Sequence, residues 1–482
     1  MARTVSIGTQ DFEKMIQRNC FYVDKTGFIK EWWESEDEVT LITRPRRFGK
    51  TLNMSMLNCF FSNKYADRRE LFEKLEIWKD GKYREIQGTY PVIFMSFAEI
   101  KQNNYNDAVE KIKRIICEVC QQFDFLKNWD GLTETEKKNI SNISYDMSDV
   151  MAQDLIKNMS NYLSRYYGKK VIILLDEYDT PMQEAYVNGY WEELVAFTRS
   201  LFNSTFKTNP YLERAIMTGI TRVSKESIFS DLNNLVVVTT TSNQYETAFG
   251  FTEEEVFNSL DEQGLSDKKD IVKTWYDGYY AKNGERMYNP RSVVASLTNN
   301  NLDSYWTSSG PYDEIFYYVK NNVAEVRNDL AVMISGEGVP AKIKEYAATA
   351  MNLTTREEIL SAMVVYGFLS YYQGKVYIPN KELMDKFDEM LQKEASLGYV
   401  YRLAKESERM LKATLEKDTS TMEEILEYAH NTETPILSYN NEVELSSIVN
   451  LVYLCARDSY RVEREDKAGL GFVDFIFYPE NP

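Results

Sequence analysis

The sequence predicts an α/β fold in which a mostly parallel sheet lies between two layers of helices. Apolar runs of strand length recur through the first half of the chain, and helical patterns separate them, an alternation that is typical of parallel sheets. The runs cover residues 39–43, 91–97, 169–179 and 214–220. Because ligands of open parallel sheets bind at the carboxyl ends of the strands, functional residues are expected at those ends.

The first of these strands leads into a basic turn and then into a helix. A strand, a Gly-Lys-Thr turn and a helix form the layout of a phosphate-binding loop, or Walker A motif, whose backbone N–H groups face the phosphates. Lys50 would supply positive charge to the β- and γ-phosphates, and the Thr51 hydroxyl would ligate Mg²⁺. The full Walker A pattern has a glycine five positions before Gly49, and in this chain Arg44 stands there. The residues expected around the phosphates are Arg44, Pro45, Arg46, Arg47, Phe48, Gly49, Lys50, Thr51 and Leu52.

A second strand end carries an acidic pair, Asp176 and Glu177, after the apolar run VIILL. This is a Walker B arrangement, in which Asp176 would hold Mg²⁺ directly or through a water and Glu177 would polarise the attacking water. Taken alone, solvated carboxylates at a strand end explain the pair equally well. Together with the Gly-Lys-Thr turn, the pair favours a composite site for ATP and Mg²⁺.

A third strand end, that of residues 214–220, adds two candidate catalytic residues. Thr218 would orient the lytic water or sense the γ-phosphate. Arg222 and Lys225 would contact phosphate, although surface charge explains both equally well. Arg222 is also a candidate arginine finger acting in trans, which would require an oligomer.

The composition indicates a soluble cytoplasmic protein. The N-terminus has no apolar core of signal-peptide type, and no window reaches the ~18 apolar residues of a membrane span. A net charge of −18 argues mildly against a surface that binds nucleic acid throughout. The single histidine argues against a His-rich zinc site and a Ser-His-Asp triad. Cys117 and Cys120 form a CxxC on the apolar side of a helical pattern, so core packing is favoured over redox or metal chemistry.

The remaining segments give a division into four parts. Within the first part, Phe21–Val23 is a candidate short strand, and residues 127–145 are expected to be a loop or an insertion. Aromatic-rich residues 250–340 are expected to form a helical lid with an aromatic core. Gln373 and Gly374 fit the tip of a hairpin. The predicted domains are an NTPase domain (residues 1–248), the lid (249–340), a small winged-like α+β module (341–400) and a connector with a partial α/β domain (401–482).

Five blocks of the sequence resemble bacterial AAA-ATPase-like proteins: FYVDKTGFIKEWW, TLITRPRRFGKT, VIILLDEYDTPMQEAY, MTGITRVSKESIFSDLNNL and WYDGYYAKNGERMYNPRSVV. The resemblance implies a P-loop NTPase fold and ATP as the nucleotide. The loop of that family is similar to RPRRFGKT, which makes Arg44 a family trait. Carried over residue by residue, the family's functional positions fall on Arg47, Gly49, Lys50 and Thr51 for the phosphate loop and on Asp176 and Glu177 for Walker B.

Proteins of this family are commonly followed by a nuclease-like domain of the PD-(D/E)XK superfamily, and the resemblance implies that the final segment begins one. Glu442 on a helix and Asp474 on a strand match two of its metal-binding acids. The Glu-x-Lys strand of that superfamily would follow Pro482, where the chain stops. We therefore expect a truncated domain without nuclease activity of its own.

Three functions stay open from the sequence. The first is Mg²⁺-dependent ATP binding and hydrolysis that drives a change in the lid and the C-terminal parts. The second is a non-hydrolysing interaction module, which Arg44 favours because it carries a Cβ where the loop must bend tightly. The third is nucleic-acid processing, with an ATPase gating a nuclease. A DNA or protein partner is compatible with each of these functions.

Overall fold

The computed structural model of the protein describes residues 7–222, 228–229, 231–307, 323–343, 353, 355–393, 397, 399–431, 442–468 and 471–479. The chain forms two compact units. The first is built mainly from Met1–Tyr305. The second is built mainly from Phe368–Pro482, together with Trp306–Ile343 and Leu353–Val364.

A five-stranded sheet, parallel throughout, forms the centre of the first unit and confirms the predicted α/β fold. In spatial order its strands are β2 (Val92–Ser96), β3 (Val171–Asp176), β4 (Leu212–Gly219), β1 (Val39–Thr43) and β5 (Leu235–Val238). Strands β1 and β3 are buried along their whole length, which explains why their sequences are near-continuous apolar runs. Strand β5 was not among the predicted strands, since its four residues are too few to give a clear pattern.

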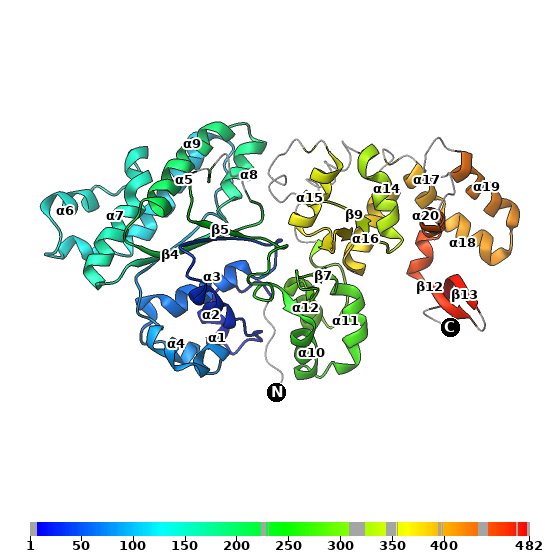
Figure 1. The fold of residues 1–482 in the computed structure, drawn as a ribbon, viewed down its shortest axis with the longest axis horizontal. Helices are drawn as coiled ribbons and strands as arrows, with labels where there is room; N and C mark the ends of the chain where they lie inside the picture. Colours follow the sequence, from blue (N-terminus) through cyan, green and yellow to red (C-terminus); the bar gives the residue numbers. More distant parts are fainter. Residues whose placement is uncertain are drawn as a thin grey trace. The chain divides into compact units, whose positions relative to one another are not determined.

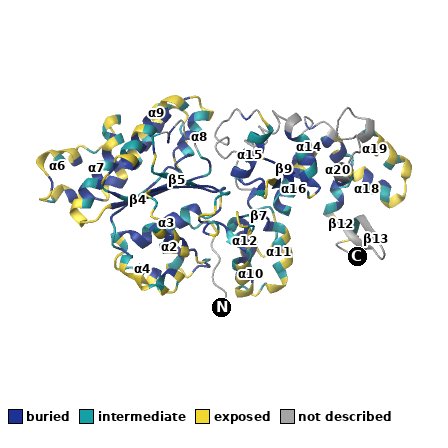
Figure 2. Cartoon of the chain, in the orientation of Figure 1, coloured by how far each residue is buried: buried dark blue, intermediate teal, exposed yellow. Residues whose placement is uncertain are grey.

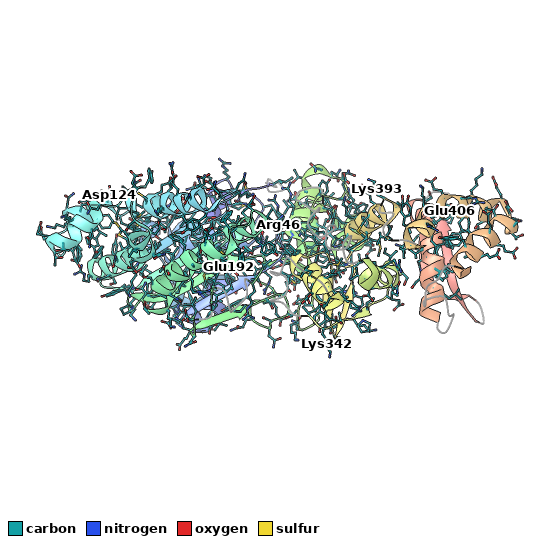
Figure 3. The ribbon with its side chains drawn as sticks, turned by 90° about the horizontal axis from the view of Figure 1, so that it is seen from above. Arg46, Asp124, Glu192, Lys342, Lys393 and Glu406 are labelled. Atoms are coloured by element: carbon teal, nitrogen blue, oxygen red, sulfur yellow. The ribbon has the colours of Figure 1, made fainter. Side chains whose placement is uncertain are left out.

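Helices cover both faces of this sheet (Figure 1). One face carries α1 (Phe12–Gln17), α2 (Gly27–Glu34), α3 (Lys50–Phe61) and α4 (Gly81–Ile86). The other carries α5 (Tyr105–Gln121), α7 (Asp149–Tyr167), α8 (Thr180–Val187) and α9 (Trp191–Phe202). Apolar side chains of the second group form one core with the strands, in which Cys117 and Cys120 are buried as predicted. The strands are largely buried, whereas outer helix faces are exposed (Figure 2) and carry charged residues such as Asp124 and Glu192 (Figure 3).

Two local predictions in this unit were wrong. Phe21–Val23 forms no strand, because Phe21 and Tyr22 are buried as core side chains of an irregular segment. Residues 127–145 are not a plain loop, since they contain α6 (Glu134–Ser141). A capping box of Thr133 and Glu136 begins this helix, and that spacing is readable in the sequence.

The aromatic-rich segment of the first unit combines helices with a small antiparallel sheet. Its elements are β6 (Phe251–Thr252), α10 (Glu253–Glu262), α11 (Lys269–Tyr276), β7 (Tyr279–Tyr280), β8 (Arg286–Tyr288) and α12 (Pro290–Asn299), with strand order β6-β8-β7. Tyr276 and Tyr288 are fully buried in its core, as the predicted aromatic packing requires. The capping box of Thr252 and Glu255 begins α10. The predicted domain boundaries after residues 248, 340 and 400 stay predictions.

The second unit is mostly helical. Its elements are α14 (Val323–Ile334), β9 (Val339–Pro340), α15 (Arg356–Tyr366), β10 (Ser370–Tyr372), β11 (Lys375–Tyr377), α16 (Lys381–Lys393), α17 (Tyr399–Lys405), α18 (Ser407–Glu416), α19 (Thr419–Asn431), α20 (Glu442–Val452), β12 (Tyr460–Ala468) and β13 (Gly471–Pro479). The hairpin predicted at Gln373 and Gly374 is confirmed, with φ values of 47° and 83° that suit a two-residue turn. Among the described helices, none combines the length and apolar character that crossing a membrane requires.

Candidate functional site

The predicted Walker A and Walker B residues lie at the same edge of the central sheet. Strand β4 separates β1 from β3. Ile42 of β1 pairs with Thr218 of β4, and Leu175 of β3 pairs with Met217. The carboxyl ends of the three strands therefore meet, which brings the loop after β1 to the acidic residues after β3.

The loop after β1 depends on two residues with positive φ. Gly49, with φ of 85°, immediately precedes α3, and Arg47 has φ of 70°. Glycine adopts this backbone region without steric cost, whereas arginine does so rarely. Helix α3 begins at Lys50, so the N–H groups of its first turn lie next to the loop.

Lys50 is buried and its side chain turns back into the loop. Its ammonium donates hydrogen bonds to the carbonyl oxygens of Arg44 and Pro45, each at 2.9 Å. Burial lowers the pKa of Lys50 to about 8, and the nearby carboxylates Asp176, Asp179 and Glu177 oppose that shift. The cation therefore lies within the field of the Walker B acids.

Asp176 is buried with only one of its carboxylate oxygens satisfied. Thr218 donates its hydroxyl proton to Oδ1. Oδ2 is buried and has no hydrogen-bond partner among the described residues. A buried oxygen without a hydrogen-bond partner destabilises the folded state unless a cation or a water molecule binds it. Mg²⁺ prefers oxygen ligands and keeps several waters, so Asp176 and Thr51, which is half-buried in the first turn of α3, fit the expected metal.

Glu177 adopts a strained backbone conformation, with φ of 50°. Such strain at a strand end is frequent in functional sites, where it aims a side chain. Thr180 donates a hydrogen bond to Oε2 of Glu177 at 3.3 Å. Burial, and secondly the charge of Asp176, raise the pKa of Glu177. A carboxylate with a raised pKa is the better proton acceptor.

Asp179 is a site residue that was not predicted. Its buried Oδ2 accepts hydrogen bonds from the backbone N–H groups of Ile220 and Thr221, at 3.0 and 2.8 Å. A Cβ atom on Gly219 would come within 2.6 Å of Oδ1. Asp179 thereby fixes the chain that leaves β4. The sequence DEYD displays this acid, but nothing in it distinguishes Asp179 from a solvated carboxylate.

The two residues expected after β4 have different surroundings. Thr218 donates its hydroxyl proton to Asp176 and thereby positions that carboxylate, so it could contact a water only as a hydrogen-bond acceptor. Arg222 is half-buried and directly follows Thr221, which Asp179 holds. Lys225 lies outside the described residues.

Arg44 was expected among the phosphate-binding residues, but its side chain points elsewhere. The guanidinium is buried and donates hydrogen bonds to backbone carbonyls of Thr43 and Tyr245, at 3.0 and 3.3 Å. The hydrogen bonds of this guanidinium group are therefore made to backbone carbonyls of the protein. Its backbone carbonyl contributes to the site by holding Lys50.

Other predicted loop residues have mixed environments. Arg46 is half-buried and its charge contributes to the lowered pKa of Lys50. Phe48 is buried, and its ring packs edge-on against Tyr279 at 5.1 Å between centroids. Leu52, on α3, is half-buried.

Arg291 is a second residue that the sequence reasoning missed. It lies in the first turn of α12, where the Asn289 side chain accepts a hydrogen bond from its backbone N–H. Its Nε is buried without a hydrogen-bond partner among the described residues. Burial and the like charge of Arg47 lower the pKa of Arg291. The positive charges of Arg47 and Arg291 therefore influence each other, which favours an anion near them.

The two metal-binding acids predicted near the C-terminus cannot be joined to a site. Glu442 begins α20 and Asp474 lies in β13, but both side chains fall outside the described residues. Within the described ranges, no group of three or more His, Cys, Asp or Glu side chains is arranged to hold a metal ion. Asp474 lies on a strand, β13, as predicted, and β13 pairs antiparallel with β12; the nuclease-like domain itself stays without support.

Comparison with known proteins gives a match to a family model and a similarity to a bacterial protein. Residues 6–229 match the model of a family described as Predicted AAA-ATPase. The chain is also 26% identical over 310 residues to the Azotobacter chroococcum mcd 1 protein described as "Uncharacterized protein in vnfD 5'region". The aligned stretch covers 64% of this chain and about half, 54%, of that relative. The family match spans β1, its loop and the acids after β3, and it suggests ATP binding by this part of the chain.

Proposed function

We propose that the first unit binds ATP with Mg²⁺ and hydrolyses it, and that the nucleotide state is passed to the lid. One observation carries the proposal. The Lys50 ammonium rests on two loop carbonyls at a strand edge where the buried Oδ2 of Asp176 has no partner among the described residues. Binding of a Mg²⁺-triphosphate requires a positive charge for the phosphates and an unsatisfied carboxylate oxygen for the metal, and both lie at this edge of the sheet.

Each residue of the site has a role in this proposal. The phosphate chain would replace the loop carbonyls as the partner of Lys50, while backbone N–H groups of α3 bind phosphate oxygens. Thr51 and Asp176 would hold Mg²⁺, which neutralises the charge of the transferring phosphate. Glu177 would polarise the attacking water, and its raised pKa supports that role.

One observation favours a second candidate, a module that binds nucleotide without hydrolysing it. Thr218 was expected to orient the lytic water, but its hydroxyl proton is used by Asp176. The attacking water would then depend mainly on Glu177 for its orientation, since Thr218 could only accept a hydrogen bond from it.

Phosphate release by wild type and Glu177→Gln separates the two candidates. For an ATPase, we expect Glu177→Gln to retain Mg²⁺-ATP binding and to release phosphate at least about 100-fold more slowly. Glu192→Gln makes the same change at an exposed acid on α9 and should leave the rate unchanged. Binding without release in the wild type would favour the non-hydrolysing module.

A further inference from the structure

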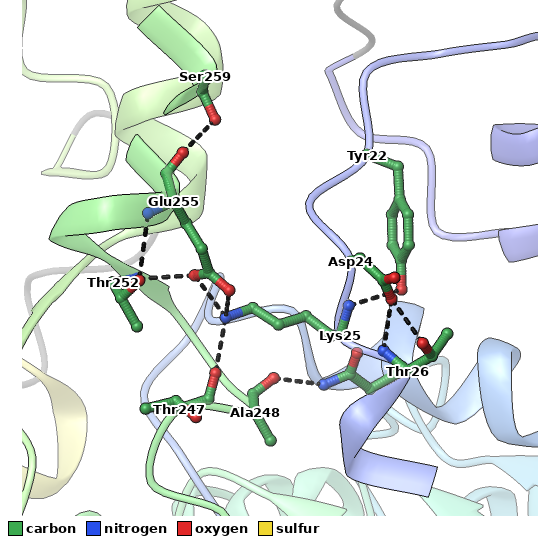
Figure 4. A network of polar contacts seen from close by, with 10 residues as sticks. Tyr22, Asp24, Lys25, Thr26, Thr247, Ala248, Thr252, Glu255 and Ser259 are labelled. Atoms are coloured by element: carbon green, nitrogen blue, oxygen red, sulfur yellow. Dashed lines mark hydrogen bonds and ion pairs between the residues drawn. The ribbon is translucent and has the colours of Figure 1, made fainter. Parts of the chain in front are cut away.

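Residues 244–250 lead from the central sheet to the lid, and we call them the bridging segment. Side chains from the N-terminal part of the chain hold its backbone. Lys25 donates to the carbonyl of Thr247 at 2.6 Å and also pairs with Glu255 of α10 (Figure 4). Asn53 of α3 donates to the next carbonyl, that of Ala248, at 2.8 Å. The bridging segment is therefore held both by the segment before α2 and by α3, the helix that follows the phosphate loop.

Arg44 makes the contacts that reach directly from the loop. Its guanidinium donates to the carbonyls of Val238 at 3.4 Å, Gln244 at 3.5 Å and Tyr245 at 3.3 Å, in addition to that of Thr43. These acceptors span the end of β5 and the start of the bridging segment. Hydrogen bonds from a charged donor are stronger than those between neutral groups, so removing the guanidinium would deprive these carbonyls of their strongest donor.

The backbone of Arg44 belongs to the nucleotide site at the same time. Its N–H donates to the carbonyl of Gly219 at the end of β4, at 3.2 Å, and its carbonyl accepts from Lys50. The guanidinium also lies over the ring of Phe249, 5.4 Å from its centroid. A single residue thus connects the strand edge, the loop lysine and the bridging segment.

Phe48 adds a parallel connection through the loop itself. Its carbonyl accepts a hydrogen bond from the N–H of Gly250 at 3.1 Å. A Cβ atom on Gly250 would lie only 3.2 Å from the Phe48 ring, so the backbone of Gly250 packs closely against that side chain. A displacement of the loop would therefore be transmitted to the last residue of the bridging segment.

We propose that Arg44 is a positioning residue that fixes the phosphate loop to the bridging segment, so that the position of Lys50 and the attachment of the lid change together. This inference rests on the proposed nucleotide binding. It gives a physical reason for an arginine where the Walker A pattern has glycine. A glycine would bend more easily, but it would leave the carbonyls of the bridging segment without their charged donor.

Three variants test the inference. Arg44→Gly restores the glycine of the pattern, and Arg44→Lys keeps the charge without the planar fork of donors. Lys25→Met is the matched control, because it releases the same bridging segment from Thr247 without touching the loop. Amide hydrogen exchange is measured on the nucleotide-free full chain, together with KM and kcat for ATP.

For Arg44→Gly we expect exchange about tenfold or more faster in both the loop and the bridging segment, and a KM for ATP about tenfold higher. Low-millimolar guanidinium chloride, far below denaturing concentrations, should restore both values, whereas equal sodium chloride should not. Arg44→Lys should restore them in part. Lys25→Met should speed exchange in the bridging segment and in the first turn of α10, but not in the loop, and guanidinium should not rescue it.

The proposal would be overturned if the exchange rates and the KM for ATP of Arg44→Gly equalled those of the wild type. An impaired Arg44→Gly that guanidinium does not restore would also overturn it, because that result indicates a general folding defect. Failure of the wild type to bind ATP would contradict the proposed function. The amide exchange is measured without nucleotide, so it tests the connection between the loop and the bridging segment independently of ATP binding.

Discussion

The hydroxyl of Thr218 donates a hydrogen bond to Oδ1 of Asp176, across the boundary between strands β4 and β3. Both side chains are buried, with 0% and 1% of their surface exposed. Because Thr218 holds one carboxylate oxygen, the rotation of the Asp176 side chain is fixed. The other oxygen, Oδ2, is then kept available for a cation.

Replacing Thr218 by valine keeps the shape of the side chain and removes the donor. We expect the Mg²⁺ concentration for half-maximal phosphate release to rise about 10- to 100-fold, as is typical when a partner of a metal ligand is lost. A Mg²⁺ titration of the ATPase rate measures this effect. Thr218→Ser retains the hydroxyl and should stay close to the wild type. An unchanged Mg²⁺ requirement in Thr218→Val would show that Asp176 does not hold the metal.

The affinity for ATP should fall as the pH rises above about 8. Burial lowers the pKa of Lys50 from its ordinary 10.5 to about 8, and bound phosphates would stabilise the ammonium and raise that pKa again. Binding above pH 8 must then take up a proton, so Kd increases by up to about tenfold per pH unit. Calorimetry across about pH 6 to 10 measures this. Lys50→Met should bind weakly and without that slope.

The same lowered pKa predicts how Lys50 affects folding stability. Between pH 8 and 10.5 the unfolded chain binds more protons at this side chain than the folded chain does. The contribution of Lys50 to the free energy of unfolding therefore rises with pH across that window. Denaturant titrations of wild type and Lys50→Met should diverge there in that direction, and parallel curves would contradict the lowered pKa.

Replacing Arg291 by glutamine should have opposite effects on stability and on binding. In the nucleotide-free protein it removes a half-buried charge that burial and the like charge of Arg47 disfavour, so the melting temperature should rise. ATP affinity should fall about tenfold, because a positive charge that favours the phosphates is lost. Thermal melts with and without ATP measure both effects. Arg114→Gln, on the exposed side of α5, should change neither, and a destabilised Arg291→Gln would contradict the account.

A methyl group at Gly219 should destabilise the protein. Its Cβ would lie 2.6 Å from Oδ1 of Asp179, so the chain at the end of β4 must shift and the free energy of unfolding should fall by about 1–3 kcal/mol. Denaturant unfolding of Gly219→Ala measures the loss. Gly81→Ala is the control, since nothing lies within 4 Å of its added Cβ. Equal stability of the two variants would contradict the role assigned to Asp179.

The parts of the fold that were predictable are those with a strong local pattern. Strands β1 and β3 are buried on both faces, which makes their sequences near-continuous apolar runs. Their carboxyl ends then locate Lys50 and Asp176 without further information. The Thr133–Glu136 capping box was equally local, and α6 was missed because the polar segment around it gives no apolar periodicity.

The rest depends on contacts between residues far apart in the chain. The guanidinium of Arg44 reaches a carbonyl 201 positions away, that of Tyr245, and no periodicity in the sequence records such a contact. The sequence shows a basic loop, for which phosphate binding is the simplest reading. Arg291 is similar, since only the folded first unit brings its charge to that of Arg47.

Binding of Mg²⁺-ATP to wild type and Lys50→Ala, measured by calorimetry with and without Mg²⁺, tests the central claim most directly. The account predicts saturable one-to-one binding to the wild type that weakens when Mg²⁺ is removed by chelation. It predicts at least about 100-fold weaker binding to Lys50→Ala, because a charged partner of the phosphates is lost. Equal affinity of the two proteins for ATP would contradict the assignment of the loop after β1 as the nucleotide site.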